Sequence, residues 1–222
     1  MGVDIADYNN DGLPDVVTLD MIPEGNFRQK QMKAASPYDK YHMAADFGFY
    51  HQVSRNMLQL NNEYGTFSEI GQLAGISYTD WSWGALFADF DNDGWQDLFI
   101  SNGHYKDITD LDYLKYRSME AVELARGNDH VKALDLINLM TSTKISNYMY
   151  RNNKNLRFKD KTKDWGLDKP SHSNGSAYVD LDLDGDLDLV VNNFNQEAFL
   201  YRNNAREQDK GNYLAVALKG NK

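Results

Sequence analysis

The sequence predicts a mainly β protein made of a repeated strand–loop–strand unit, with a helical insertion. An acidic pattern of nine residues, D-x-[ND]-x-D-G-x-x-D, occurs three times, at residues 7–15, 89–97 and 180–188. Short segments rich in β-branched and aromatic residues lie on both sides of each acidic pattern, as is typical of strands. A chance match would supply one such pattern, so three of them indicate an internal repeat.

Each repeat is predicted to begin at a glycine and to run through a strand, the acidic loop and a second strand. A glycine lies five residues before the first Asp of every loop, at Gly2, Gly84 and Gly175. The expected strands before the loops are 3–6, 85–88 and 176–179, and those after the loops are 16–19, 98–101 and 189–192. A glycine at the sixth loop position lets the chain turn sharply between the two strands.

A second recurring element predicts a hairpin between one acidic loop and the next. The segment NMLQLNNEYGTF at 56–67 is matched by NYMYRNNKNLRF at 147–158, and AFLYRNN at 198–204 begins a third copy. We expect the turns at Asn61-Asn62 and Asn152-Asn153, because Asn tolerates positive φ and bonds its own backbone. The second Asn of each pair lies 27 residues before the first Asp of the next loop, and this constant spacing indicates one structural unit.

Two insertions interrupt the repeats, at about 21–52 and 104–146. The first contains two prolines that break it, so we expect a loop with one short helix. The second is expected to be helical, because TDLDYLKYRSMEAVELARG has a Thr/Asp start, an apolar spacing typical of helices and a stop at Gly127. A further helix is expected to begin at Asn128 or Asp129.

The acidic loops have the composition of sites for a hard cation. Asp and Asn oxygens at the first, third, fifth and ninth positions, with a backbone carbonyl at the seventh, are ligands that Ca²⁺ accepts. Mg²⁺ would require fewer carboxylates and stricter octahedral geometry. We therefore expect three Ca²⁺ sites, in which Leu13, Trp95 and Asp186 contribute only backbone carbonyls. The predicted metal ligands are Asp7, Asn9, Asp11, Leu13, Asp15, Asp89, Asp91, Asp93, Trp95, Asp97, Asp180, Asp182, Asp184, Asp186 and Asp188.

Other interpretations of these loops are weaker. An EF-hand would need a Glu at the twelfth position and helices on both sides, but that position holds Thr18, Ile100 or Val191 and the flanks are predicted strands. Zinc would favour His or Cys, which the loops lack. The remaining alternative is a set of ordinary acidic turns on a solvated surface, although turn chemistry does not require an Asp at the ninth position.

The overall composition argues against several classes of protein. The net charge is −10 and the basic residues are scattered, which is unlike proteins that bind nucleic acid or anionic lipid surfaces. The chain has no cysteine, so a disulfide framework and thiolate metal sites are excluded. It has no long apolar run, and we expect no direct membrane insertion. A cation is the partner that this charge favours.

The combined pattern resembles the FG-GAP/VCBS repeat. The acidic loop between strands, the N-x-L-x-x-N element, and a downstream Gly75-Ile76 or Gly166-Leu167 carry this resemblance. The longer segments RNMLQLNN and DWSWGALFADFDNDGWQDLFISNG are similar to bacterial relatives of cartilage acidic protein, in which such repeats precede an ASPIC/UnbV domain. NYLAVALKGNK, at 212–222, resembles the first strand of that domain.

The resemblance implies a partial β-propeller built from calcium-bearing blades. Residues 1–211 would form the repeat region, with units near 2–75, 84–167 and 175–205, and residues 212–222 would begin a truncated ASPIC/UnbV-like domain. A propeller needs at least four blades, so we expect contacts to the remaining blades of a longer parent chain. The resemblance also implies an extracytoplasmic protein that is secreted, periplasmic or attached to the outer membrane.

The leading functional hypothesis is a non-catalytic, calcium-stabilised propeller segment of an exported protein, which serves binding or adhesion with a glycan or protein ligand. The alternative is a propeller-based polysaccharide-active enzyme, for which Trp81 and Trp83 would stack on a sugar and His104 would face a cleft. The further candidates for such an enzyme are His51, Asp107 and His172. No nucleophile–base pair or separated carboxylate couple stands apart from the metal loops in the sequence, so no catalytic residue is assigned.

The two insertions support a third hypothesis, in which they form the surface that a partner recognises. Inserted segments on a rigid β scaffold commonly carry recognition. The helix predicted in the second insertion is expected to expose Tyr113, Tyr116 and Met119.

Overall fold

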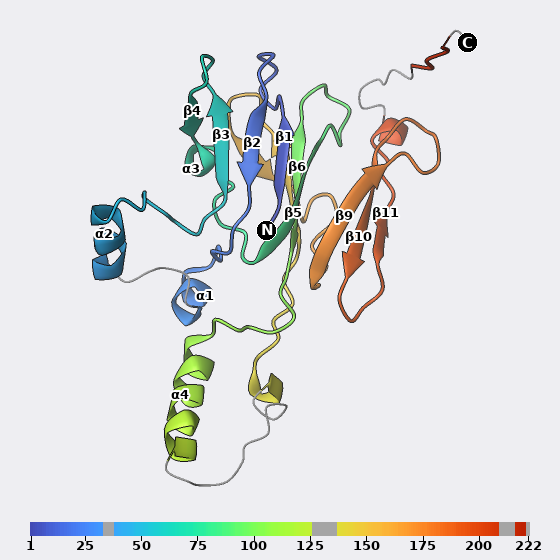
Figure 1. Ribbon diagram of the computed structural model, residues 1–222. Helices are drawn as coiled ribbons and strands as arrows, with labels where there is room; N and C mark the ends of the chain where they lie inside the picture. The colour runs from blue at the N-terminus through green and yellow to red at the C-terminus, as the bar shows by residue number, and fades with distance from the viewer. Residues whose placement is uncertain (33–37, 126–136, 209–215, 221–222) are drawn as a thin grey trace.

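Three antiparallel sheets make up most of the computed structural model, which describes residues 1–32, 38–125, 137–208 and 216–220 (Figure 1). The first sheet contains β1 (Val3–Ala6), β2 (Asp15–Thr18), β3 (Met57–Asn61) and β4 (Phe67–Glu69), in that order. The second contains β5 (Ser82–Ala88), β6 (Asp97–Asn102), β7 (Tyr148–Asn152) and β8 (Phe158–Asp160). The third contains β9 (Ser173–Val179), β10 (Asp188–Asn193) and β11 (Phe199–Tyr201). The prediction of a mainly β protein is confirmed.

The acidic loops join the first two strands of each sheet, as predicted. In each sheet, the last pair of residues before the loop consists of the residue that precedes the first Asp and the Asp at the ninth position. These pairs are Ala6 with Asp15, Ala88 with Asp97 and Val179 with Asp188. The strand after each loop therefore begins one residue earlier than predicted, because the ninth-position Asp closes the hairpin.

The turns of the other hairpins lie just after the Asn pairs, so the predicted positive φ at these residues was wrong, whereas the predicted bond of Asn61 and Asn152 to their own backbone is confirmed. Asn61 and Asn152 are the last paired residues of β3 and β7 and stay extended. Their side-chain oxygens accept the N–H groups of the residues two positions further on, at 3.1 and 2.8 Å. The donor of this bond is the first residue of the turn with positive φ. In these turns, the residues with positive φ are Glu63, Tyr64 and Gly65 between β3 and β4, and Lys154 and Leu156 between β7 and β8.

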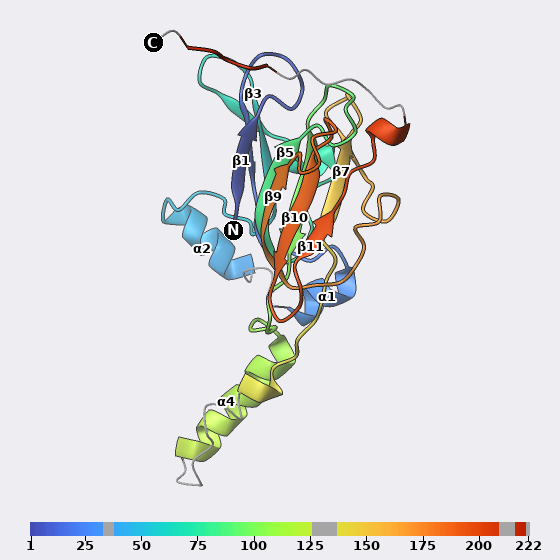
Figure 2. The same cartoon turned by 90° about the vertical axis from the view of Figure 1, so that its right-hand side faces the viewer.

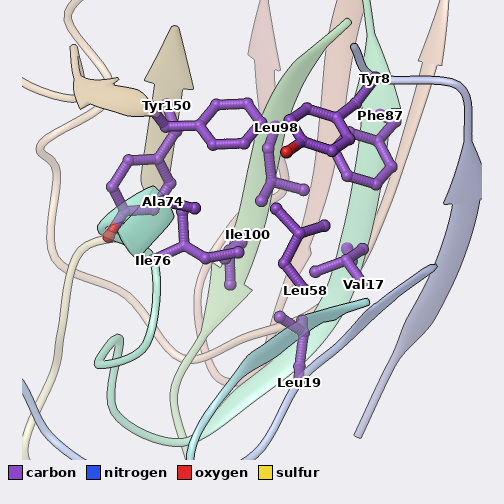
Figure 3. Packing of buried hydrophobic residues seen from close by; sticks show 12 residues of the cluster. Tyr8, Val17, Leu19, Leu58, Ala74, Ile76, Phe87, Leu98, Ile100 and Tyr150 are labelled. Carbon is purple, nitrogen blue, oxygen red and sulfur yellow. The ribbon is translucent and has the colours of Figure 1, made fainter. Parts of the chain in front are cut away.

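Neighbouring sheets pack face to face through two hydrophobic clusters. The first strands of the sheets, β1, β5 and β9, lie next to one another, so the three sheets form a row in which the face of one packs on the face of the next (Figure 2). Between the first and second sheets, Tyr8 stacks on Phe87 with ring centroids 6.2 Å apart, in one cluster with Leu58 and Ile100 (Figure 3). The cluster between the second and third sheets includes Phe90, Phe99, Met149, Leu189 and Val191. The middle sheet is therefore buried on both faces.

The outer faces of the first and third sheets are apolar but uncovered within the described residues. The residue that follows the first loop Asp is 0% exposed at Tyr8 and 5% at Phe90, but 52% at Leu181 in the third repeat. On the first sheet Ile5 is 61% exposed, whereas its counterpart Phe87 on the second sheet is 3% exposed. Each repeat thus carries apolar side chains for a neighbour on both sides.

An asparagine at the end of the third strand connects each of the later sheets to the one before it. The Nδ2 group of Asn152 donates to Gln96 O at 3.1 Å in its own sheet and to Tyr8 O at 2.8 Å in the first repeat. Asn203, which follows β11, donates in the same way to Phe90 O at 2.7 Å in the second repeat. One side chain thus joins two successive acidic loops.

Short helices lie in the insertions and beside the sheets. The first insertion holds α1 (Asn26–Gln31) and α2 (Tyr38–Asp46), where one short helix was predicted. α4 (Leu111–Ala125) confirms the helix predicted in the second insertion and projects away from the sheets (Figure 1). α3 (Gly71–Ala74) follows β4, and η1 (Arg206–Gln208) follows β11.

Several predictions about the insertions and the C-terminal segment are only partly tested. Gly127, Asn128, Asp129 and the proposed boundary at 211–212 lie outside the described residues, and residues 216–220 have no regular secondary structure. Tyr113 is buried rather than exposed as predicted, whereas Tyr116 and Met119 are exposed. Within the described ranges, the helices are too short or too polar to cross a membrane.

Replacing Asn152 by Ala should lower the free energy of unfolding by about 2–4 kcal/mol, because a buried side chain loses three hydrogen bonds. Chemical denaturation of the full chain measures this loss. Asn153→Ala is the matched control, since Asn153 is exposed and its replacement should change the free energy by less than about 0.5 kcal/mol. Equal losses in the two variants would contradict the role given to Asn152.

Candidate metal centres

The three acidic loops share one backbone conformation. The fourth residue of each loop is left-handed, with φ of 57° at Asn10, 53° at Asn92 and 62° at Leu183. The glycine at the sixth position follows with a φ of 87°, 84° or 96°, which favours glycine. The first Asp accepts the N–H groups of the fifth and sixth residues at 2.8–3.2 Å in all three loops. These bonds curl the loop and bring its side-chain oxygens together.

The second and third loops gather three carboxylates each, and these groups could hold a metal ion. Oxygens of Asp89, Asp91 and Asp93 lie within 4.8 Å of one another, and so do oxygens of Asp180, Asp182 and Asp184. In the first loop Asn9 replaces the middle carboxylate, and its Nδ2 group donates to Asp11 Oδ2 at 2.8 Å. The backbone conformation recurs in all three loops, and the first loop has an amide in place of the middle carboxylate.

The second loop contains buried carboxylate oxygens that lack a hydrogen-bond partner in the described part of the chain. Asp91 is 8% exposed and its Oδ1 is unpaired, and Asp97 is 1% exposed with its Oδ2 unpaired. A buried charged oxygen without a partner is strongly unfavourable. Because the gathered ligands are all oxygens, a hard divalent cation such as Ca²⁺ is the partner that they suit.

The Asp at the ninth position has a structural role besides the predicted metal role. One of its oxygens accepts the backbone N–H of the asparagine that ends the third strand, at 2.8 Å in each repeat: Asp15 with Asn61, Asp97 with Asn152 and Asp188 with Asn203. The other oxygen accepts the N–H of Tyr8 at 3.3 Å in the first loop and that of Leu181 at 3.0 Å in the third. Coordination by Asp15 and Asp188 stays a prediction, while Asp97 has an oxygen available for a cation.

The electrostatic surroundings of Asp97 disfavour its charged form. Burial has the largest effect and, with the charges of Asp91, Asp93 and Asp89, raises the pKa of Asp97 to about 8, although the N–H of Asn152 acts in the opposite direction. Burial also raises the pKa of Asp15 and of Asp89. A cation among these groups would favour the ionised carboxylates.

The residues at the seventh position stabilise the loops through their backbone N–H groups. Leu13, Trp95 and Asp186 donate to the fifth-position Asp at 2.8, 3.1 and 3.0 Å. Coordination by their carbonyl groups stays a prediction. The loops are also joined in a row, because Asn10 Nδ2 donates to Gly94 O at 2.9 Å and Asn92 Nδ2 donates to Asp186 Oδ1.

The side chain of Asp186 has a role that the sequence analysis did not predict. It is fully buried, and besides the bond from Asn92 it accepts the N–H of Arg206 at 2.7 Å. Oxygens of Asp184, Asp186 and Glu207 form a further acidic group within 4.8 Å of one another. Glu207 was missed because the other two repeats have no acidic residue at the equivalent position.

Two arginines that the sequence analysis did not assign contact the second and third loops. Arg151 pairs with the third and fifth residues of the second loop, and Arg202 pairs with the same positions of the third. Both precede the asparagine that ends the third strand. The recurrence of YRNN at 150–153 and 201–204 is the signal that could have identified them.

Trp81, Trp83 and His104, predicted as ligand-binding residues, lie together where β5 begins and β6 ends. The His104 ring centroid lies 4.5 Å from that of Trp81 and 6.2 Å from that of Trp83. Trp83 Nε1 donates to Gly103 O at 2.7 Å, which orients its ring. All three side chains are partly exposed, so they form a small aromatic surface.

Asp107 lies near this aromatic surface but is held by other residues. Its Oδ1 lies 2.8 Å from Arg28 Nη2, and its Oδ2 accepts hydrogen bonds from Thr141 and Thr143 at 3.0 and 2.7 Å. With Trp81 and His104 it lines a cavity of about 10 Å³, which is room for about one water molecule. Asp107 therefore anchors the first insertion to the second.

The other two histidine candidates make contacts outside the aromatic surface. His172 is buried, its Nε2 lies 3.3 Å from Ser142 Oγ, and burial lowers the pKa of its ring. His51 is exposed on the first insertion, with its Nδ1 2.8 Å from Tyr41 Oη.

A hollow of about 540 Å³ lies between the second and third sheets, lined by residues that include Phe90, Met149, Trp165 and Tyr201. Between the first and second sheets, Phe158 of β8 packs against Tyr8 with ring centroids 5.5 Å apart. The third sheet has only three described strands, so the hollow lies where the equivalent of β8 would pack. We assign no ligand site to it.

Comparison with known proteins supports the predicted repeat. The FG-GAP-like repeat family matches residues 44–100, which include β3 to β5, the second acidic loop and the first part of β6. A search of curated proteins found no match. The resemblance of residues 212–222 to an ASPIC/UnbV domain stays a prediction.

Without divalent cations, the free energy of unfolding should fall as the pH rises from about 4 to about 8. The folded state raises the pKa of Asp97 to about 8, so it retains a proton there that the unfolded chain, with a pKa of about 3.9, releases. Asp97→Asn stays neutral and keeps an oxygen for the Asn152 N–H, so it should flatten this pH dependence. Denaturation in EDTA at pH of about 5 and about 8 measures the difference. The same pH dependence in both proteins would contradict this assignment.

Proposed function

We propose that this chain is a non-catalytic, calcium-stabilised segment of a β-propeller that serves binding or adhesion in an exported protein. The observation that carries the proposal lies in the second acidic loop. There, Asp91 Oδ1 and Asp97 Oδ2 are buried without a hydrogen-bond partner among the described residues, in the loop that gathers three carboxylates. A bound cation would satisfy both oxygens.

Calcium suits these loops better than other divalent cations. Four side chains and one carbonyl, completed by water or a bidentate carboxylate, supply the six to eight oxygens that Ca²⁺ accepts in flexible geometry. Mg²⁺ is smaller and usually retains several of its waters. Because the same backbone conformation recurs in each loop, we assign one Ca²⁺ to each of the three.

The sheets have the features expected of propeller blades. Each is an antiparallel sheet with its strands in chain order, the first strands lie next to one another, and the FG-GAP-like repeat family matches part of the chain. A propeller needs at least four blades. Further blades of a longer parent chain would therefore cover Ile5 and Leu181 on the outer faces.

The cation would stabilise the contact between blades as well as the loop itself. In the second repeat the loop ends at Asp97, whose Oδ1 binds the N–H of Asn152, and Asn152 in turn donates to Tyr8 O in the first repeat. Weak sites, with dissociation constants of about 10⁻⁴–10⁻³ M, are typical of extracellular calcium modules. This role therefore agrees with a secreted, periplasmic or outer-membrane-attached protein.

Trp81, Trp83 and His104 are the proposed contact for a glycan or protein ligand. Their rings lie within 6.5 Å of one another between centroids and are partly exposed. Aromatic side chains supply a large apolar contact with a polar atom at the edge, which is why they are common at binding surfaces. The surface adjoins both insertions through Arg28 and Asp107, so the insertions are positioned to border a bound ligand.

Adding Ca²⁺ should raise the melting temperature above that in EDTA, because a site filled to about 100 times its dissociation constant adds about 2.7 kcal/mol of stability. Mg²⁺ at the same concentration should give a smaller rise. Asp91→Asn should reduce the calcium effect, whereas Asp39→Asn, which removes the same charge from exposed α2, should leave it unchanged. Differential scanning calorimetry of the full chain measures all four effects. Equal melting temperatures in Ca²⁺ and in EDTA would refute the proposal.

A polysaccharide-active enzyme is the second candidate function. The observation in its favour is that Trp81 and His104 line one cavity with Asp107, which places an imidazole near a carboxylate beside an aromatic surface. An imidazole can act as a general acid or base. Against this, Arg28 and two threonines already bind the carboxylate of Asp107.

Assays on a panel of polysaccharides separate the two functions. The non-catalytic proposal predicts no turnover by the wild-type chain. Turnover that is lost in His104→Ala and retained in His51→Ala, a control on the exposed first insertion, would establish the enzyme instead.

A further inference from the structure

Arg151 and Arg202 occupy the same place in successive repeats and contact the same two loop positions. In each arginine, Nε contacts Oδ2 of the third loop residue and Nη2 contacts Oδ2 of the fifth. The distances are 2.5 Å for Arg151–Asp91, 2.9 Å for Arg151–Asp93, 2.7 Å for Arg202–Asp182 and 3.4 Å for Arg202–Asp184. One guanidinium thus bridges two carboxylates of each site, a geometry that lysine cannot reproduce.

The first repeat replaces this arrangement with neutral residues. Leu60 stands where the other repeats have arginine, and Asn9 stands at the third loop position where they have Asp. The amide of Asn9 donates to Asp11 Oδ2 at 2.8 Å. The same oxygen of the fifth-position Asp therefore receives a donor in all three loops, from an amide in the first and from an arginine in the others.

The two substitutions change the charge of the sites in opposite directions. At the first, third, fifth and ninth positions the first loop offers three carboxylates, at Asp7, Asp11 and Asp15, whereas the second and third loops offer four each, and the third loop has a fifth Asp at its seventh position. One arginine beside each of these offsets the carboxylate added at the third position, while Lys154 adds positive charge beside the second loop and Glu207 adds negative charge beside the third. The additional carboxylate and the arginine occur together in two repeats and are absent together from the other.

We propose that Arg151 and Arg202 set the cation affinity of the second and third sites, as built-in positive charges that offset the additional carboxylate. This inference rests on the proposed function of the loops as cation sites. Arg151 leaves room for an ion, because it binds Asp91 through Oδ2 while Asp91 Oδ1 is unpaired in the described chain. The two arginines lower the affinity by repulsion and keep the carboxylates oriented, rather than being displaced.

Arg151 is the sharper position to test, because its partners Asp91 and Asp93 are well buried. Lys154 adds a second contact to Asp93 at 3.2 Å, from an exposed side chain. Arg202 is more exposed and also pairs with Glu207 at 2.6 Å, so its removal should not disturb folding.

Calorimetric titration of the full chain with Ca²⁺ alone tests the proposal. Arg151→Leu, which installs the residue of the first repeat, should tighten one site roughly ten-fold at low salt, and the gain should shrink at high salt. Arg151→Lys retains the charge and should stay within about three-fold of the wild type. In EDTA, Arg151→Leu should melt at a lower temperature than the wild type, because Asp91 loses its cationic partner and Asp93 keeps only Lys154.

Arg202→Leu provides the same test at a position where folding is not at risk, and it should also tighten one site. Unchanged or weaker binding in the leucine variants, or equal tightening in Arg151→Lys, would overturn the proposal. A wild-type chain that binds no Ca²⁺ would instead refute the proposed function of the loops. The two failures are therefore distinguishable in one set of titrations.

Discussion

The pairing of strands within each sheet and the contact between sheets both rely on one hydrogen bond, which the backbone N–H of an asparagine at or just after the end of the third strand donates to the ninth-position Asp. It measures 2.8 Å in all three repeats, although the two residues are 46, 55 and 15 positions apart in the chain. Because the same bond joins the second strand to the third at all three separations, both the short connection and the two long insertions are compatible with it. The Asn side chain then reaches the preceding repeat, so one pair of residues sets both the register within a sheet and the contact between sheets.

This arrangement concentrates negative charge, and the loops offset the resulting repulsion in three ways. Backbone N–H groups of the curled loop bind the first and fifth carboxylates. An arginine within the third strand (Arg151) or directly after it (Arg202) binds the third and fifth carboxylates of two loops. Two oxygens of the second loop remain buried and unpaired in the described chain, and these are the strongest sign that a cation completes the arrangement. The sharing of Asp97 between the strand pairing and the ion site explains how calcium would stabilise a region well beyond the loop.

The sequence predicted the strands and the acidic loops well, because alternation of apolar residues and the loop pattern are both local signals. Prediction from the sequence failed where contacts between residues distant in the chain determine the structure. Asn61 and Asn152 have the local chemistry of turn residues, but a distant Asp holds each of them in a strand, so the turns move to the residues that follow. The ion pairs of Arg151 and Arg202 and the buried side chain of Asp186 also depend on residues far apart in the chain. A comparison of the repeats that included the residue before each asparagine would have revealed the arginines.

The number of Ca²⁺ ions bound by each chain tests the central claim most directly, because it asks whether the repeated loops are metal sites. Equilibrium dialysis of the full chain, after removal of divalent cations with EDTA, provides this number without any assumption about stability or ligand. We expect three ions per chain, one for each acidic loop. A chain that retains no Ca²⁺ at millimolar concentrations of the free ion would contradict this expectation and leave the loops as acidic turns stabilised by their own N–H groups and arginines.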